Sequence, residues 1–247
     1  MPGLLFDHIA IAMPRMADAT ATLVGRLGGV PAYGMPSGAY RFGQWAFGNG
    51  ARLEVLEPMG ADSFLHRFLA SRGPGVHHVT FVVPSAREVC DRARAAGYDI
   101  VGYDDSDPRW IEAFLHPKQA LGIVVQLAES HPGPGTDPTH GWQPPRAPPP
   151  VTIVGLRMRA SSRERARRQW THVVQGEESV GGSGELMYRW PGSPMRIVVE
   201  IDTAGDEGPL CIEYTSDLPV DLPESPDGAL GVRFVRKPVA PAPPSPA

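Results

Sequence analysis

Cysteine is scarce in this chain of 247 residues, which contains Cys90 and Cys211 and no others. With one cysteine in each half, the sequence gives no basis for a disulfide framework, and we expect both to behave as small apolar side chains. No uncharged apolar run approaches the length of about 18 residues that a membrane helix requires, and the start shows no signal-like pattern. We therefore expect a reduced, cytoplasmic protein without a membrane partner.

An excess of positive charge is also missing. The 23 basic and 27 acidic residues give a formal net charge of -4, which is not the basic field that nucleic-acid binding usually needs. We expect a small-molecule substrate and no nucleic-acid partner. No residue pattern fixes the oligomeric state, so a homodimer remains open.

The first half of the sequence contains a duplication. Residues 7–14 (DHIAIAMP) and residues 77–84 (HHVTFVVP) align with a shift of 70, which places His8 on His78. Two similar units packed about a pseudo-twofold axis can bring equivalent side chains to one central point. The histidines of both repeats are therefore candidates for a shared site.

A second pair of segments supports this duplication. Residues 53–55 (LEV) precede residues 125–127 (VQL) by 72 positions, which places Glu54 on Gln126 within another apolar run. Unpaired buried polar groups are costly, so the repetition favours a common role for these polar residues.

Each repeat is predicted to follow the order βαβββ. Hydrophobic periodicity and turn residues place these elements at strand 4–13, helix 16–27 and strands 30–33, 40–47 and 52–56 in the first repeat, and at strand 75–83, helix 85–96 and strands 100–103, 110–115 and 122–127 in the second. These repeats define a predicted domain over residues 1–130.

The rear half resembles a degenerate copy of the same pattern. A Pro-rich linker is expected over residues 131–150, a third unit with a shortened fourth over 151–237, and a disordered tail over 238–247. The elements expected in the rear half are a strand at 152–159, a helix at 162–174 and strands at 184–190, 195–202, 209–214 and 231–235. Aligning its strands with the first repeat puts Leu156 and Val198 at the candidate ligand positions, which predicts no metal site there.

The motifs of the first half resemble the vicinal oxygen chelate superfamily, which includes glyoxalase I, methylmalonyl-CoA epimerase, extradiol dioxygenases, and fosfomycin and bleomycin resistance proteins. DHIAIA at residues 7–12 looks like its opening strand, and GPGVHHV at 73–79 and AFLHPK at 113–118 are most similar to the epimerase branch. The resemblance implies an α+β fold in which paired βαβββ units form a cup-shaped mixed sheet. It also implies a divalent metal held by His8, Glu54, His78 and Gln126.

The chemistry of this ligand set is reasonable by itself. Two imidazoles, a carboxylate and an amide oxygen suit Zn, Ni, Co, Mn or Fe(II), and they leave positions open for water or substrate. A metal in such a site stabilises an enolate and so assists removal of the neighbouring proton. The competing interpretation of a single strand histidine is a hydrogen-bonded core residue. His77 alternates with His78 and is expected to point away from it.

Amides occupy both positions where the resemblance implies a base. Gln126 stands where glyoxalase I and the epimerases usually carry Glu, and Gln44 falls where the epimerase carries a suspected base. An amide does not titrate near neutral pH. His116, Tyr40 or a metal-bound hydroxide could take this role, and Gln44 and His116 are our candidate catalytic residues.

The candidate substrate-binding residues are aromatic. Trp45, Phe47 and Trp110 could line an apolar wall of the cup, with core packing as the alternative.

Three functions follow as hypotheses. The first is a metal-dependent isomerase or lyase that acts on a small oxygen-rich acid or acyl thioester through enolate stabilisation. The second is a non-catalytic small-molecule binding or resistance protein of the same fold, which the two amides favour. The third is an extradiol-type dioxygenase with Fe(II).

Overall fold

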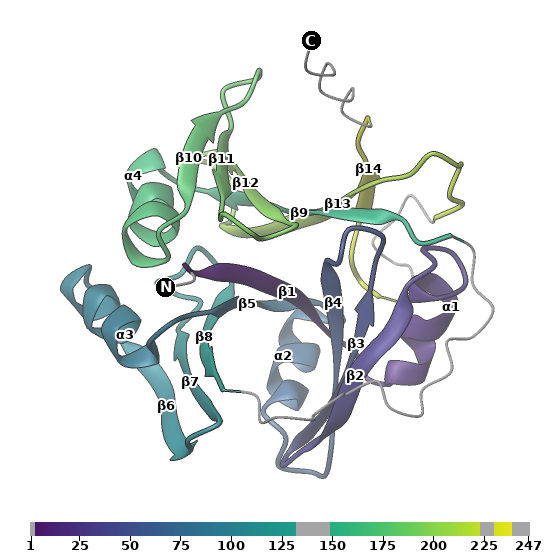
Figure 1. The fold of residues 1–247 in the computed structure, drawn as a ribbon, viewed down its shortest axis with the longest axis horizontal. Helices are drawn as coiled ribbons and strands as arrows, with labels where there is room; N and C mark the ends of the chain where they lie inside the picture. Colours follow the sequence, from purple (N-terminus) through teal and green to yellow (C-terminus); the bar gives the residue numbers. More distant parts are fainter. Residues whose placement is uncertain (1–2, 132–148, 223–229, 239–247) are drawn as a thin grey trace.

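The computed structural model describes residues 3–131, 149–222 and 230–238, so most of the predicted linker and nearly all of the predicted tail lie outside the described residues. The first half forms an eight-stranded sheet (Figure 1). Its strands are β1 (Leu5–Ala12), β2 (Val30–Ser37), β3 (Tyr40–Ala46), β4 (Arg52–Pro58), β5 (Gly75–Val82), β6 (Ile100–Asp107), β7 (Trp110–Leu115) and β8 (Val124–Ser130).

The strand order β2-β3-β4-β1-β5-β8-β7-β6 shows the duplication directly. The first strands of the two repeats, β1 and β5, pair antiparallel at the centre, and each pairs in parallel with the last strand of its own repeat, β4 or β8. The prediction of paired βαβββ units in a curved mixed sheet is confirmed. Equivalent positions of the two repeats therefore meet in the middle of the sheet.

The helices of the first half are 3-10 helix η1 (Met16–Ala19), α1 (Thr20–Leu23), α2 (Leu65–Arg72) and α3 (Ala86–Ala95). The side chain of Ser85 caps α3 by accepting the Glu88 amide hydrogen. The single helix predicted over residues 16–27 is instead a 3-10 turn followed by one α-helical turn.

Helix α2 is missing from the predicted elements. It is short, and its apolar residues Leu65, Phe68 and Leu69 fill little more than one turn, which is too short a pattern to identify a helix. These residues pack on the face of β1 and β4 that carries Ala10 and Leu56. In Figure 1 this helix lies inside the curve of the first sheet, on the side away from the second sheet.

The rear half forms a six-stranded sheet in the order β10-β11-β12-β9-β13-β14. Its strands are β9 (Thr152–Ala160), β10 (Glu177–Val180), β11 (Leu186–Arg189), β12 (Arg196–Ile201), β13 (Gly208–Thr215) and β14 (Phe234–Arg236). This order matches β2-β3-β4-β1-β5-β8, and the parallel and antiparallel pairings match as well. Strand β10 is absent from the predicted elements.

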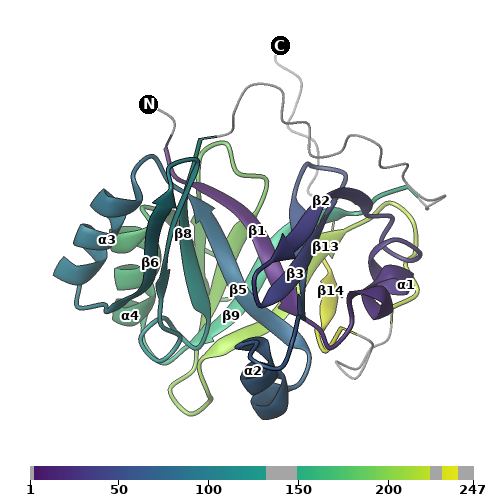
Figure 2. The same cartoon turned by 90° about the horizontal axis from the view of Figure 1, so that it is seen from below.

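The helix predicted from residue 162 to 174 has two parts. Helix α4 (Arg163–Arg167) begins after Ser162, whose side chain accepts the Arg165 amide hydrogen, and continues into a π-helical segment, η2 (Arg168–Val173). Trp170 and Val173 of this segment are fully buried. Figure 2 shows α3 and α4 close together at one end of the molecule, where the Arg92 guanidinium donates to the Val173 carbonyl over 2.8 Å.

The two sheets share one hydrophobic core. Phe6 of β1 and Phe81 of β5 stack with ring centroids 5.2 Å apart, and both meet the indole of Trp190 from the rear half. Such aromatic burial supplies a large apolar area and specific edge-to-face contacts. On β5, alternation along the strand places His78 on the opposite face from Phe81. On β1, the irregularity at Asp7, between Phe6 and His8, reverses the alternation and places His8 on the opposite face from Phe6.

Strand register corrects the alignment of the rear half by one residue. Gly155 pairs with Arg196 and Glu213 as His8 pairs with Arg52 and Thr80, so Gly155 and not Leu156 occupies the position of His8. The same comparison places Val198, Cys211 and Val235 at the positions of Glu54, His78 and Gln126. Among the described residues, these rear positions offer one thiol and no imidazole or carboxylate.

Across the described ranges, no helix is long and apolar enough to cross a membrane.

Gly155 gives a test of the rear register. Its φ is +148°, and a Cβ there would overlap the Arg196 carbonyl. We expect Gly155→Ala to lower the free energy of unfolding by roughly 1–3 kcal/mol from backbone strain, with a further loss from the overlap, measured by urea denaturation. Gly182→Ala is the matched control because a Cβ at Gly182 has no atom within 4 Å. Equal stability of the two variants would contradict the register.

Candidate metal centre

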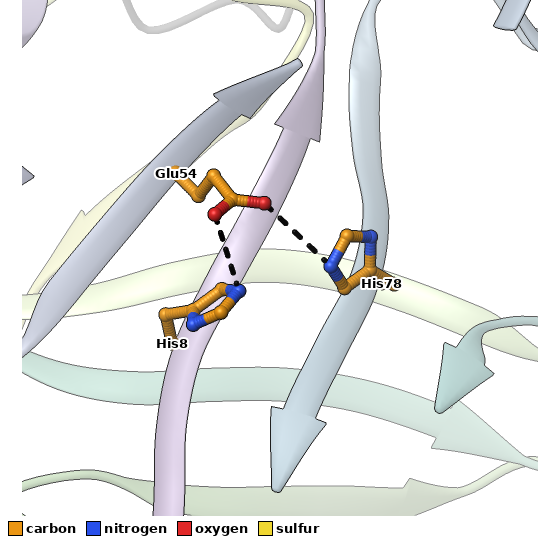
Figure 3. Close-up of side chains that lie close together, drawn as sticks. All are labelled: His8, Glu54 and His78. Carbon is orange, nitrogen blue, oxygen red and sulfur yellow. Dashed lines mark ion pairs between the residues drawn. The ribbon is translucent and has the colours of Figure 1, made fainter. Parts of the chain in front are cut away.

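Three buried side chains from neighbouring strands meet on the inner face of the first sheet. On β1, Ala10 pairs with Glu54 of β4 on one side and with His78 of β5 on the other, and His8 lies two residues before Ala10 on the same face. His8 Nε2 is 3.5 Å from Glu54 Oε2, and His78 Nε2 is 3.8 Å from Glu54 Oε1 (Figure 3). All three residues are at most 6% exposed.

The ring of His8 is held in place by a contact at Nδ1, the nitrogen that points away from Glu54. Its Nδ1 is 2.7 Å from Asp7 Oδ2, and Asp7 in turn pairs with Arg52. A carboxylate on the far nitrogen holds a ligating imidazole in place and increases its basicity. Burial opposes protonation of His8, but the charges of Glu54 and Asp7 outweigh it and raise the pKa of His8 to about 9. In the metal-free protein a proton on His8 therefore balances the buried Glu54.

His78 is held by its neighbour in sequence. The pairing of β1 with β5 skips His77, because Ala10 faces His78 and Ile11 faces Val76. This bulge turns His77 toward the inner face, where its Nδ1 is 3.0 Å from His78 Nδ1 and its ring packs on Phe68 of α2. The expectation that His77 points away from His78 is wrong for this reason.

His78 remains neutral and presents a free nitrogen. Burial, together with the charges of His77 and His8, lowers the pKa of His78 well below its usual value. With Nδ1 engaged by His77, its Nε2 faces Glu54 and has no hydrogen-bond partner among the described residues. A buried ring nitrogen without a hydrogen-bond partner is costly in either tautomer.

The donor set fits a divalent cation. His8, Glu54 and His78 can each offer one ligand atom, and these atoms lie within 4.8 Å of one another. Within the described part of the chain, this is the one such group of three histidine, cysteine or acidic residues. Nitrogen and oxygen donors of this kind suit Zn, Ni, Co, Mn or Fe(II). A cation there would satisfy His78 Nε2 and replace the proton on His8.

Gln126, the fourth predicted ligand, reaches this group through Thr80. The fully buried Thr80 hydroxyl donates to Gln126 Oε1 over 2.7 Å, and its oxygen is 2.9 Å from His8 Nε2. The amide nitrogen of Gln126 donates to Glu112 Oε2 over 2.7 Å. The amide oxygen is therefore on the side of the three clustered residues.

Gln44 and Tyr40 lie beside the cluster. The Gln44 amide nitrogen donates to Glu54 Oε2 over 2.8 Å, so Gln44 restrains the carboxylate. Burial raises the pKa of Tyr40, and the charges of Glu112 and Glu54 add to the increase. Tyr40 consequently stays a hydroxyl at neutral pH, which makes it a hydrogen-bond donor and a poor base.

The other predicted site residues do not all lie near the cluster of His8, Glu54 and His78. Trp45 and Phe47 belong to the core between the two sheets, on the opposite face from Gln44, so neither lines the inner face. Trp110 is 40% exposed and donates from Nε1 to Glu112 Oε2 over 2.9 Å, which leaves it near the site. His116 is exposed in a turn, where its Nδ1 accepts the Lys118 amide hydrogen over 3.2 Å. None of its hydrogen bonds reaches the cluster.

Three residues next to the predicted ligands were not identified from the sequence: Asp7, Thr80 and Glu112. Thr80 follows His78 by two positions on the same strand, so period-two alternation could have found it. The position of Asp7 depends on the irregularity within β1 between Phe6 and His8, and that of Glu112 depends on the pairing of β7 with β8. Sequence spacing alone reveals neither.

Comparison with known proteins gives consistent matches in the first half. The model of the glyoxalase/bleomycin resistance protein/dioxygenase superfamily matches residues 7–114, a range that contains the three clustered residues. The uncharacterized protein YqjC of Bacillus subtilis is 30% identical over 129 residues, which are 50% of this chain and 90% of that protein. An ethylmalonyl-CoA/methylmalonyl-CoA epimerase of Cereibacter sphaeroides is 29% identical over 133 residues, which are 50% of this chain and 96% of the epimerase.

One solved structure extends the likeness across both sheets. A mutant of 4-hydroxymandelate synthase from Streptomyces coelicolor aligns with a TM-score of 0.60 and 15% identity, covering 88% of this chain and 72% of the synthase. At this identity the likeness concerns the fold and not the activity.

The contact between Asp7 and His8 leads to a prediction about affinity. Removing the outer partner of a ligating imidazole typically weakens metal binding about 10- to 100-fold. We expect this loss in Asp7→Asn, measured by competition with a chromophoric chelator. The control is Asp18→Asn, whose carboxylate pairs with exposed Arg15. Unchanged affinity in Asp7→Asn would contradict the assignment of His8 as a ligand.

Proposed function

Because the chain belongs to the glyoxalase/bleomycin resistance protein/dioxygenase superfamily, we propose that it is a divalent-metal-dependent enzyme of the isomerase or lyase type. Its substrate is a small oxygen-rich acid or acyl thioester. The observation that carries this proposal is the unpartnered, buried His78 Nε2 that faces Glu54, with His8 on the other side of the carboxylate.

The proposed chemistry is proton transfer next to a carbonyl group. A divalent cation bound here would stabilise the negative charge that develops on the substrate oxygen when the adjacent carbon loses its proton. His8, Glu54 and His78 would hold the cation, with Gln126 as the fourth ligand. This set carries a single formal negative charge, from Glu54, so the ion would keep a net positive charge toward substrate.

The neighbouring residues would orient these groups and the substrate. Gln44 holds Glu54 through its amide, and the Tyr40 hydroxyl can donate to a substrate oxygen. Phe64, immediately before α2, and Phe68 within α2 pack against His77 and cover one side of the inner face. Displacing water from this face would strengthen the electrostatic interactions within it.

An acyl thioester is the substrate class that we favour. Support comes from the 29% identity to the epimerase, whose name specifies CoA thioesters. We also propose a cytoplasmic location, in keeping with two cysteines that are both free and buried.

A binding protein without turnover is the second candidate. The observation that favours it is the pair of amides, Gln44 and Gln126, at the inner face, because neither can accept a proton at neutral pH. Such a protein would bind its ligand without chemical change.

A dioxygenase is the third candidate. Two histidines and one carboxylate form the ligand combination of many non-haem Fe(II) oxygenases. Oxygen consumption by the Fe(II)-loaded protein with catechols would support this alternative over the isomerase.

The main test combines metal content with deuterium exchange. We expect about one transition-metal ion per wild-type chain and metal-dependent incorporation of deuterium at the carbon next to the thioester of methylmalonyl-CoA in D₂O. His78→Ala should lose both the metal and the exchange, because its Nε2 is a direct ligand. His131→Ala is the matched control, since this exposed histidine contacts Glu129 away from the cluster.

The outcomes separate the candidates. Metal binding without exchange on any acid or thioester, together with tight retention of an unchanged ligand, would favour the binding protein. Wild-type protein that takes up no metal after reconstitution would contradict the proposed metal enzyme.

A further inference from the structure

The carboxylate of Glu112 contacts the Gln126 amide from a neighbouring strand. It lies on β7, where Phe114 pairs with Gln126 of β8. Glu112 is two residues before Phe114, so its side chain is on the same face of the sheet as that of Gln126. Its Oε2 accepts two hydrogen bonds, one from Gln126 Nε2 over 2.7 Å and one from Trp110 Nε1 over 2.9 Å. The indole therefore fixes the carboxylate that contacts the amide.

The two ends of the Gln126 amide have different chemistry, and their partners distinguish them. A carboxylate such as Glu112 accepts hydrogen bonds and donates none, so the group that faces it must be the amide NH₂. At the other end, the Thr80 hydroxyl donates to Oε1 over 2.7 Å while its oxygen is 2.9 Å from His8 Nε2. Reversing the amide would place an oxygen against the carboxylate and an NH₂ against the hydroxyl hydrogen.

We propose that Glu112 is a positioning residue that fixes the Gln126 side chain with its oxygen directed toward His8 and its NH₂ directed away. The proposal rests on the proposed function, because the oxygen would then be available as a neutral ligand to the cation. Glu112 places its negative charge next to the Gln126 NH₂, at the opposite end of the amide from the proposed ligand oxygen. A charged partner makes this hydrogen bond stronger than one between neutral groups.

The uncharged side chain of Gln126 suits its position next to the carboxylate of Glu112. A carboxylate at position 126 would face Glu112 at hydrogen-bond distance, and two like charges so close together would repel each other. The amide avoids this repulsion and still presents an oxygen to the inner face. The structure thus gives a local reason for an amide at this position.

The first experiment is independent of metal. In metal-free protein, the side-chain NH₂ resonances of Gln126 are assigned by their disappearance in Gln126→Ala. We expect wild-type resonances that exchange slowly with solvent and shift in Glu112→Ala. The variant Glu112→Gln should retain part of the protection, because the new amide can turn its oxygen to Gln126. Resonances that do not change in Glu112→Ala would overturn the proposal.

The second experiment measures Zn²⁺ affinity by competition with a chromophoric chelator. Glu112→Ala should weaken binding about 10- to 100-fold, and Glu112→Gln should recover part of this loss. In the Gln126→Ala background, Glu112→Ala should add little, because the effect passes through Gln126. The control is Asp105→Ala on β6, where an exposed carboxylate lies 3.9 Å from Arg87.

These results separate the two proposals. An equal loss from Glu112→Ala with and without Gln126 would overturn the positioning role while wild-type zinc binding supports the metal centre. Wild-type protein that binds no Zn²⁺ would contradict the metal centre, and the amide resonances would still decide whether Glu112 orients Gln126.

Discussion

The buried carboxylate of Glu54, placed between two imidazoles, is the interaction on which the rest of the site depends. A buried charge is tolerated when an opposite charge and hydrogen bonds compensate it. In the metal-free protein the compensation comes from protonated His8 and from the Gln44 amide. His78 stays neutral and leaves one nitrogen unpaired. The centre is thus stable enough to fold and yet incomplete, which is the condition expected of a site that gains a cation.

Duplication explains how the sheet can carry such a site. The first strands of both repeats lie side by side, so one face of the sheet collects His8 and His78 while the other packs Phe6 and Phe81 against the rear sheet. Rigid packing on one face helps to hold ligands on the other within the narrow geometry that a cation requires. The rear sheet repeats the strand order without the ligands, and Gly155 stands where His8 would be.

Much of this arrangement could be predicted from the sequence, because the repeat fixes which strands are equivalent and period-two alternation fixes which side chains share a face. His8, Glu54 and His78 follow from that logic, and the structure brings them together. The same reasoning failed for His77 and for the alignment of the rear half. A bulge turned His77 inward. In the rear half no polar side chain marks the position of His8, and only the strand pairing shows that Gly155 and not Leu156 occupies it. Trp45 and Phe47 could not be assigned to a face by composition alone, since aromatic residues suit both cores and pockets. Glu112 is recognised only through the pairing of β7 with β8.

The most direct test of the central claim is an anomalous difference map from crystals of the wild-type protein grown with Zn²⁺. The account predicts one dominant peak on the inner face of the first sheet, about 2.0–2.2 Å from His8 Nε2, a Glu54 oxygen and His78 Nε2. A map in which zinc binds only at exposed histidines such as His66 or His131, with His78 Nε2 still unpartnered, would contradict it.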